Sequence, residues 1–383
     1  MAKQPLKKKE VKTSSFSDFK KTAGFTTNIA DKPLEWIEMP KGFIDALHVQ
    51  IPQGYVSIIA GHSHTGKSTL INHAITSAQR QGLIPVIYDT ENNFDFGYAK
   101  AMGFEAEPVY ENYYDEETGE MKKRVATYDG DFLYFNSTAL AERYGGWDYS
   151  TGKETSKKRS VPVIEDIVKS MNELLNAQDE GLINQGLLFV WDSVGSIGSF
   201  KSYKSDVGNN MFDANAISVA FNTLVNNRIP SSRKVTSKYT NTFLVVNKVW
   251  LDSSKNPVGP PSLSLKGGTS LFYGAHGLVI LCGGQLTSGT KKLVATSKGV
   301  NYNYGIETKL KCLKNQLPAP YTITYEGKVY CTPNGYIATD EIEQYKKEYI
   351  SEILKELNKS LDGKDSVTEN DVTFIEEEVT DVD

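Results

Sequence analysis

The stretch Gly61-His62-Ser63-His64-Thr65-Gly66-Lys67-Ser68 fits the pattern G-x-x-x-x-G-K-[ST] and decides the fold that we expect for this chain. It follows the apolar run 55–60, and the residues after it repeat apolar side chains at helical spacing. The pattern predicts a buried strand, a tight loop that begins and ends at glycine, and a helix that begins near Lys67. In such a loop, backbone N–H groups at the positive end of the helix dipole can hold a chain of phosphates.

The same loop predicts a site for ATP and Mg²⁺. We expect the Lys67 ammonium to contact the β- and γ-phosphates and the Ser68 hydroxyl to ligate a Mg²⁺ ion that bridges them. The residues predicted to contact the nucleotide in this segment are Gly61, His62, Ser63, His64, Thr65, Gly66, Lys67, Ser68 and Thr69.

Composition favours an intracellular globular protein. Of the 383 residues, 39% are hydrophobic and 23% are charged, which is ordinary for a soluble domain. No apolar run approaches the roughly 20 residues that span a bilayer, and the Lys-rich N-terminus has no apolar core of a signal peptide. We therefore expect a cytoplasmic protein without a membrane partner. The three cysteines, Cys282, Cys312 and Cys331, are scattered and predict neither a disulfide framework nor a zinc site.

Charge is concentrated at the two ends of the chain. Residues 1–12 carry five lysines and one glutamate, a net charge of +4, whereas residues 361–383 carry nine acidic side chains and one lysine, a net charge of −8. Because the whole chain has a net charge of −5, the part between is almost neutral. Any nucleic-acid binding must therefore come from a local group of cations.

Strands that alternate with helices over the first two thirds of the chain predict an α/β fold with a mostly parallel central sheet. Strands are predicted at 84–88, 132–135, 187–191 and 242–246, and helices at 160–175 (with Ser160 as the cap), 212–228 and 340–361. Later strands at 278–282, 292–296, 308–313 and 321–325 are close enough to pair as antiparallel hairpins. We expect a flexible basic arm (1–33), an ATPase core (34–335) with an insertion (about 105–160) that contains a hairpin, a C-terminal helix (336–361) and a disordered acidic tail (362–383).

Polar residues follow three of the predicted parallel strands at the point where each strand ends. The tripeptide Asp89-Thr90-Glu91 follows one strand, Asp192 follows the next, and Asn247-Lys248 follows the third. Because parallel sheets collect their active sites at the carboxyl ends of strands, these side chains should meet the 61–68 loop. Asp192 fits a carboxylate of the Mg²⁺ shell, and Glu91 fits a base that orients the attacking water.

At this level the sequence resembles the RecA family of strand-exchange recombinases, including phage UvsX-type relatives. The resemblance covers roughly 34–326 outside the 105–160 insertion. It rests on the 61–68 loop, on Asp89-Thr90-Glu91 with Asp95 and Tyr98, on Val190-Trp191-Asp192-Ser193-Val194, on Val246-Asn247-Lys248, on Gly267-Gly268-Thr269-Ser270-Leu271, and on the segment 311–320 (KCLKNQLPAP).

The resemblance implies a RecA-like P-loop fold and a protein that forms helical filaments on single-stranded DNA, hydrolyses ATP, and pairs that strand with homologous duplex DNA. It implies that Glu91 is the catalytic base, that Asp95 and Tyr98 contact adenine, and that Lys314 reaches the ATP of a neighbouring subunit. The DNA contacts that it implies are Lys204, Lys255, Lys266, Gly267 and Gly268. Loading or mediator proteins and a single-strand-binding protein would be its partners, in the host cytoplasm if the chain is phage-encoded.

Two residues depart from the bacterial members of that family. Lys248 stands where they have a glutamine, and Gln316 stands where they have a second lysine. We expect Lys248 to supply charge at the γ-phosphate that the family takes from the neighbouring subunit. Two alternatives stay open: a ring-shaped helicase or motor of replication, for which Arg228 or Arg233 would serve as an arginine finger, and a non-catalytic recombination mediator.

Overall fold

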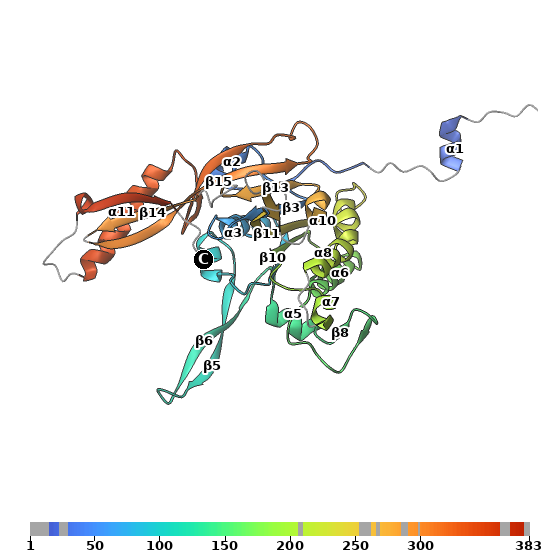
Figure 1. Cartoon of the computed structure of the whole chain (residues 1–383), viewed down its shortest axis with the longest axis horizontal. Helices are drawn as coiled ribbons and strands as arrows, with labels where there is room; N and C mark the ends of the chain where they lie inside the picture. The colour runs from blue at the N-terminus through green and yellow to red at the C-terminus, as the bar shows by residue number, and fades with distance from the viewer. Residues whose placement is uncertain are drawn as a thin grey trace, which may run out of the picture.

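The computed structural model describes residues 15–22, 30–205, 210–252, 262–265, 269–284, 290–297, 299–360 and 368–378. Within them, one large mixed sheet forms the centre of the protein (Figure 1). Six neighbouring strands of this sheet are parallel, in the order β13-β3-β11-β10-β4-β7. Their bounds are β3 (Val56–Gly61), β4 (Ile84–Asp89), β7 (Leu133–Asn136), β10 (Leu187–Val194), β11 (Thr242–Asp252) and β13 (Leu278–Cys282). The prediction of a mostly parallel α/β sheet is confirmed.

Antiparallel strands extend the sheet beyond β13. The long strand β15 pairs with β13 on one side and, along its length, with β16 and β14. Strand β17 pairs with β16, and β18, the last strand among the described residues, covers the outer edge of β14. The bounds are β14 (Lys291–Ser297), β15 (Val300–Asn315), β16 (Glu326–Thr332), β17 (Gly335–Ile337) and β18 (Val372–Glu378); elsewhere β12 (Ser262–Leu265) pairs with β11.

The parallel strands carry apolar side chains on both faces, so helices cover both faces of this part of the sheet. On β10, Leu188 and Val190 belong to one buried cluster, whereas Phe189 and Trp191 belong to the other. The first cluster includes side chains of α2 (Lys41–Leu47), α3 (Lys67–Arg80) and α4 (Phe96–Ala101). The second includes side chains of α5 (Ser137–Tyr144), α6 (Ile164–Asp179), α8 (Asn210–Ala220), the π-turn Leu224–Arg228, α9 (Ile229–Ser231) and α10 (Thr269–Gly274).

A third apolar cluster lies at the C-terminal end of the chain. Helix α11 (Ile342–Ser360) packs Ile342, Tyr345 and Ile353 against side chains of the antiparallel strands, and Phe374 of β18 packs against the same cluster. Part of the predicted disordered tail is therefore ordered. Val372 and Phe374, two residues apart in this edge strand, pack against the third cluster, and Glu376 pairs with Lys291 at 2.9 Å.

The insertion contributes one strand to the sheet and two projecting ribbons. Strand β7 joins the sheet beside β4, as predicted for 132–135. The antiparallel hairpin β5 (Glu107–Asp115) and β6 (Glu120–Asp129) extends away from the body of the protein, as Figure 1 shows. A shorter ribbon, β8 (Trp147–Asp148) with β9 (Lys153–Glu154), lies close to α7 (Phe200–Ser205).

Several sequence predictions were wrong in detail. No strand forms at 321–325, because Asn315 Nδ2 donates to the carbonyls of Tyr321 and Ile323, at 2.7 Å each, and β16 begins only at residue 326. Helix α6 begins after Val163 and not at Ser160, since Asp166 Oδ2 accepts from the Val163 N–H at 2.8 Å.

The N-terminal arm also ends earlier than residue 33. Asp31 forms a bridge and a 2.8 Å ion pair with Lys234, and the Lys32 N–H donates to the Arg233 carbonyl at 2.7 Å. Among the described residues of the arm, Phe16–Thr22 form helix α1. Beyond the arm, β1 (Trp36–Ile37) pairs with β2 (Ile51–Pro52) in a small separate ladder. None of the helices in the described part of the chain is both long and apolar enough to cross a bilayer.

Candidate functional site

The 61–68 segment leaves β3 as a loop and enters α3 at Lys67, as predicted. Gly66 has a φ of 87°, which an L side chain rarely adopts, and a Cβ atom there would lie 2.5 Å from Cys331 Sγ. A Cβ at Gly61 would lie 2.5 Å from the Cys282 carbonyl oxygen. Close packing therefore leaves no room for a side chain at either glycine.

A pocket of about 640 Å³ opens beside this loop at the carboxyl ends of β3, β4, β10 and β11. Most of the predicted nucleotide and metal residues line it. The lining residues are Ser63, His64, Thr65, Gly66, Lys67, Ser68, Thr69, Glu91, Asn93, Asp95, Tyr98, Asp192, Ser193, Lys248, Asn303, Gly305, Ile306, Cys331, Thr332 and Pro333. Gly61 and His62 are not among them: Gly61 ends β3, and the His62 carbonyl accepts a hydrogen bond from Lys67 Nζ.

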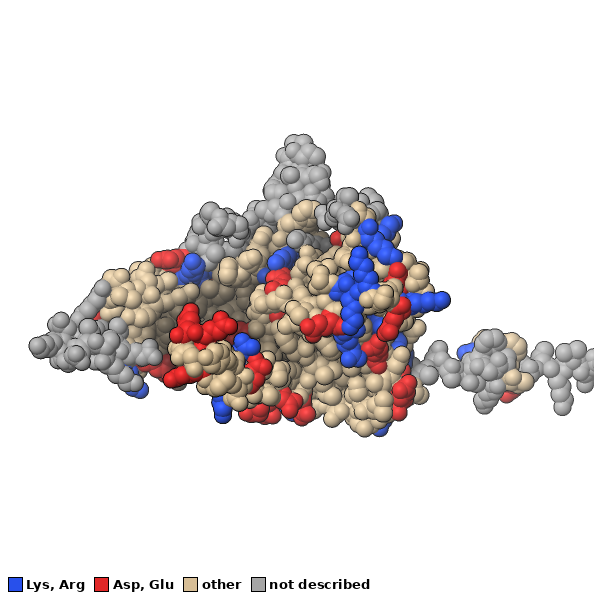
Figure 2. All heavy atoms as spheres, turned by 90° about the horizontal axis from the view of Figure 1, so that it is seen from below, with Lys and Arg blue, Asp and Glu red and all other residues tan. Residues whose placement is uncertain are grey.

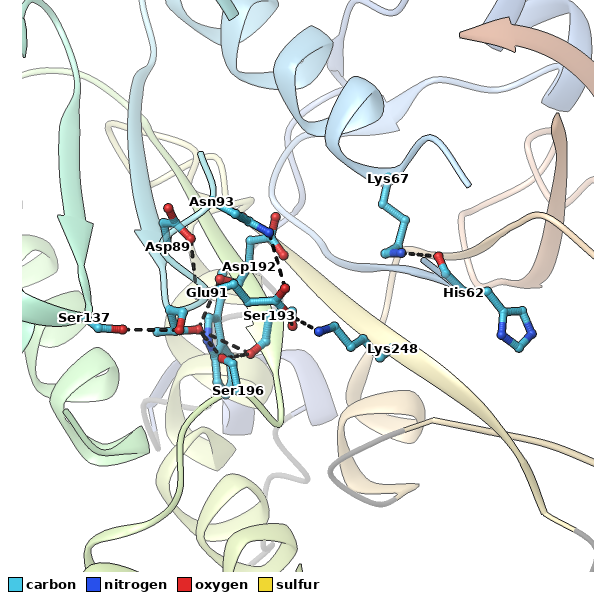
Figure 3. A network of polar contacts seen from close by, with 12 residues as sticks. His62, Lys67, Asp89, Glu91, Asn93, Ser137, Asp192, Ser193, Ser196 and Lys248 are labelled. Atoms are coloured by element: carbon cyan, nitrogen blue, oxygen red, sulfur yellow. Dashed lines mark hydrogen bonds and ion pairs between the residues drawn. The ribbon is translucent and has the colours of Figure 1, made fainter. Parts of the chain in front are cut away.

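Glu91 is held by two side chains from neighbouring strand ends (Figure 3). The Ser193 hydroxyl donates to Glu91 Oε1, and Lys248 Nζ lies 2.9 Å from the same oxygen. Burial raises the pKa of Glu91, but the Ser193 hydrogen bond and Lys248 outweigh this effect and lower the pKa below its ordinary value. Glu91 is therefore a charged carboxylate at neutral pH, and its Oε1 atom is engaged by Lys248.

Asp192 and Lys67 lie deeper in the pocket and are perturbed by burial. Burial, together with the negative charges of Glu91 and Asp89, raises the pKa of Asp192 to about 7. Burial also lowers the pKa of Lys67, an effect that Asp192 and Glu91 oppose. A nearby cation would stabilise the charged form of a carboxyl group in this environment, which is the property expected of a metal ligand.

Tyr98 connects the loop side of the pocket to the opposite wall. Its hydroxyl donates to the Thr332 carbonyl at 3.0 Å and lies 2.8 Å from Thr69 Oγ1, which therefore acts as the donor to Tyr98. Asp95 caps α4 by accepting from the Tyr98 N–H at 3.0 Å. These contacts fix both residues at the edge of the pocket, beside the backbone of β16.

The antiparallel strands also support the loop from behind. The Tyr336 hydroxyl donates to the Gly66 carbonyl at 2.9 Å, and the Thr308 hydroxyl donates to the Thr65 carbonyl at 3.3 Å. Tyr336 and Thr308 are buried. Two carbonyls of the loop are thus held by side chains from β17 and β15.

The sequence did not predict Ser193 or the residues that form the opposite wall of the pocket. Asn303, Gly305 and Ile306 come from β15, and Cys331 and Thr332 come from β16, so they reach the pocket only through the pairing of distant strands. No motif marks them. Ser193 carried a signal, because it directly follows Asp192 at a strand end.

Lys314 does not line this pocket. Its Nζ atom donates to the carbonyls of Phe272 and Tyr273 at 2.7 and 3.1 Å, near the C-terminal end of α10. Lys204 lies on α7 and forms a 2.9 Å ion pair with Asp148 of β8. Lys255, Lys266, Gly267 and Gly268 lie outside the described residues. The predicted roles of all six residues in DNA or neighbour contacts stay predictions.

The arrangement suits a metal that is shared with a bound phosphate. Within the described residues, no group of three or more His, Cys, Asp or Glu side chains could hold an ion alone. Ser68 and Asp192 instead offer a hydroxyl and a carboxylate in one pocket. Mg²⁺ commonly binds through one or two protein oxygens together with substrate phosphates.

Comparison with known proteins points to one family over short segments. No family model matches the chain. It is 40% identical to Protein RecA of Aquifex aeolicus over 60 residues, which cover 16% of this chain and 17% of that protein. It is 46% identical to Protein RecA of Mesoplasma florum over 52 residues (14% and 16%), and 32% identical to Protein RecA of Salinispora tropica over 109 residues (27% and 30%). The matches span about a sixth to under a third of these relatives, which supports a RecA-like relationship.

Proposed function

We propose that this chain is a DNA-dependent ATPase of the RecA type, which forms filaments on single-stranded DNA and promotes pairing and strand exchange with homologous duplex DNA. One observation carries the proposal: the pocket at the strand ends is lined by Lys67, Ser68, Glu91 and Asp192 together, beside a loop whose glycines have no room for a side chain. The partial similarity to RecA proteins supports the same activity.

The residues in the pocket fit ATP and Mg²⁺. Gly66 has no room for a side chain beside Cys331, and half-buried Lys67 adds a cation next to a loop that would hold the phosphates through its backbone N–H groups. Ser68 and Asp192 are the residues that would hold Mg²⁺, which would neutralise charge on the phosphate oxygens. Asp95 and Tyr98 at the edge would contact the adenine.

Three side chains have separate roles in the proposed hydrolysis. Glu91 would accept the proton of the attacking water or orient that water, since its lowered pKa keeps it charged. Lys67 would stabilise negative charge that develops on the transferred phosphoryl group. Lys248 would supply a further cation on the same side, and its 2.9 Å contact with Glu91 links the base to β11, the strand that leads into the proposed DNA loop.

The assembly and partners follow from the same proposal. Single-stranded DNA would contact the segments around 203–212 and 249–268, which include Lys204, Lys255, Lys266, Gly267 and Gly268. Lys314 would act at the ATP of the neighbouring subunit. The protein would work in the cytoplasm, with mediator and single-strand-binding proteins as partners.

The test is ATP hydrolysis with and without single-stranded DNA, together with electron microscopy. We expect slow hydrolysis by the protein alone, stimulation by single-stranded DNA, and helical filaments with a non-hydrolysable ATP analogue. Closed rings would instead favour a helicase or motor. Within the described residues, however, Arg228 is held by Asp179 at 2.7 Å and Arg233 stacks on Tyr55, so neither arginine is poised as a finger. Equal turnover with and without DNA, and no assembly, would reject the proposal.

A further inference from the structure

The hairpin β5–β6 has two faces of different chemistry. On one face, Asp115 pairs with Lys122 and Glu111 pairs with Arg124, and Glu120 lies opposite Asp115. The other face carries four exposed apolar side chains in two cross-strand pairs, with Asn112 and Lys123 between the two pairs. Tyr110, Tyr114, Met121 and Val125 are 60%, 62%, 66% and 40% exposed, and Tyr110 lies opposite Val125 as Tyr114 lies opposite Met121. An apolar ribbon face that stands away from the body needs a partner to be covered.

The tip of this hairpin is acidic, which restricts the partner. Residues 107–129 contain seven acidic and three basic side chains, a net charge of −4. Glu116, Glu117 and Glu120 at the tip are exposed and form no ion pair among the described residues. A nucleic acid would be repelled by this charge. The partner surface must therefore be basic and must offer apolar side chains as well.

A surface of that kind lies on the same chain. Lys153, Lys157, Lys158 and Lys201 are exposed, and the first three form no ion pair among the described residues. Exposed Val161 and Tyr203 lie among them, because buried Arg159 contacts both: its Nη1 donates to the Val161 carbonyl at 3.2 Å, and its guanidinium lies 6.0 Å from the Tyr203 ring. We call these six residues the basic patch.

Buried polar contacts hold the segment that carries the basic patch against the body of the protein. Arg159 forms two hydrogen bonds with Asp166, at 2.8 and 2.9 Å, and both side chains are almost completely buried. Tyr149 donates to the same carboxylate at 2.7 Å, and Lys204 ties α7 to Asp148. These contacts hold the β8–β9 ribbon against α6 and α7 and so position the backbone that carries the lysines.

The two surfaces lie apart on one face of the protein. Figure 2 shows acidic residues over the β5–β6 hairpin and, at a separate place on the same face, a group of basic residues over the β8–β9 and α7 region. Because each is attached to the same rigid core, they do not meet within one chain. In a dimer with a two-fold axis, each hairpin would lie on the basic patch of the other copy, so that the contact forms twice.

We propose that this chain pairs with a second copy of itself through the β5–β6 hairpin of each copy and the basic patch of the other. The pairing covers the apolar face of the hairpin with Val161 and Tyr203 and matches the three glutamates of the tip with the lysines. It is independent of nucleotide and of DNA, and it is a contact additional to any between subunits of a filament.

Sedimentation of the full chain without ATP or DNA tests the pairing. At about 0.05 M salt we expect a dimer that dissociates at about 0.5 M salt, because exposed charges are screened. The triple change Glu116→Lys, Glu117→Lys and Glu120→Lys should weaken self-association about tenfold or more, as should Lys153→Glu, Lys157→Glu and Lys158→Glu. In an equimolar mixture of the two variants, both contacts of the mixed dimer are charge-matched, so the mixture should dimerise, and a chain with all six changes should regain the wild-type dimer.

Controls separate this contact from general charge effects and from DNA binding. Lys347→Glu with Lys355→Glu changes exposed lysines on α11 and should leave the dimer intact. Carbodiimide cross-linking of mixed light- and heavy-isotope copies should join residues 116–120 of one copy to residues 153–158 of the other. A monomer at low salt, or failure of the six-fold variant to recover, would overturn the pairing. Weaker DNA binding by the lysine variant with unchanged sedimentation would overturn it too and would assign the patch to DNA. ATPase activity is measured separately, so each proposal fails by its own result.

Discussion

The parallel and antiparallel parts of the central sheet build the same pocket by different means. The parallel part supplies charged side chains at strand ends: Lys67 after β3, Glu91 after β4, Asp192 in β10 and Lys248 in β11. The antiparallel part supplies a wall from β15 and β16 and neutral hydrogen bonds from Thr308 and Tyr336. The difference teaches that the chemistry of this site and the shape of this site are encoded in separate parts of the chain.

If that division is correct, changes in the parallel part should mainly alter kcat, and changes in the antiparallel part should mainly alter KM. The largest effect is expected for Glu91→Gln. Removal of a positioned base should lower the ATPase rate by about 100-fold or more, while the neutral amide keeps the shape of the pocket. Fluorescent-nucleotide titration should show ATP affinity within about threefold of wild type. A rate that falls less than tenfold would mean that another group orients the water.

A smaller effect is expected for Lys248→Gln, which separates two roles of this lysine. Loss of the cation should lower DNA-stimulated ATPase about tenfold. Because Lys248 lowers the pKa of Glu91, its removal should raise that pKa, and the acid limb of the pH–rate profile should move to higher pH. If adding Gln316→Lys to this variant restores the rate, a lysine at position 316 can replace the charge of the lysine at position 248. If Lys248→Gln weakens only DNA binding and leaves the pH profile unchanged, the lysine belongs to the DNA loop.

The smallest effect is expected for Tyr336→Phe on the antiparallel side. The change deletes one hydroxyl that supports the Gly66 carbonyl and keeps the buried ring. One such hydrogen bond contributes about 1 kcal/mol, so KM for ATP should rise about fivefold with kcat unchanged. Steady-state kinetics measures both constants. Tyr330→Phe, whose hydroxyl contacts Glu307 away from the pocket, is the matched control. A fall in kcat for Tyr336→Phe would contradict the division between the two parts.

The part that could be predicted from sequence is the part built by local segments. A strand, a glycine loop and a helix follow each other directly in 56–80, so one motif placed Lys67 and Ser68. Strand-end carboxylates such as Glu91 and Asp192 were found because parallel strands end at one edge. The wall residue Gly305 could not be found, because it reaches the pocket only through the register of β15 with its neighbours. The contact of Glu91 with Lys248 was also missed: both were assigned to one site, but their pairing depends on side-chain geometry.

The position of β18 in the sheet has a consequence for the order in which the chain is made. Strand β14 ends at Ser297, but the strand that covers its outer edge begins at Val372, close to the C-terminus. A ribosome releases the N-terminal parts of a chain first, so β14 emerges long before its partner exists. During that interval its edge is open to other chains, and open edges recruit foreign strands. Newly made copies of this protein therefore expose this edge to aggregation until residues 372–378 have been made and have paired with it.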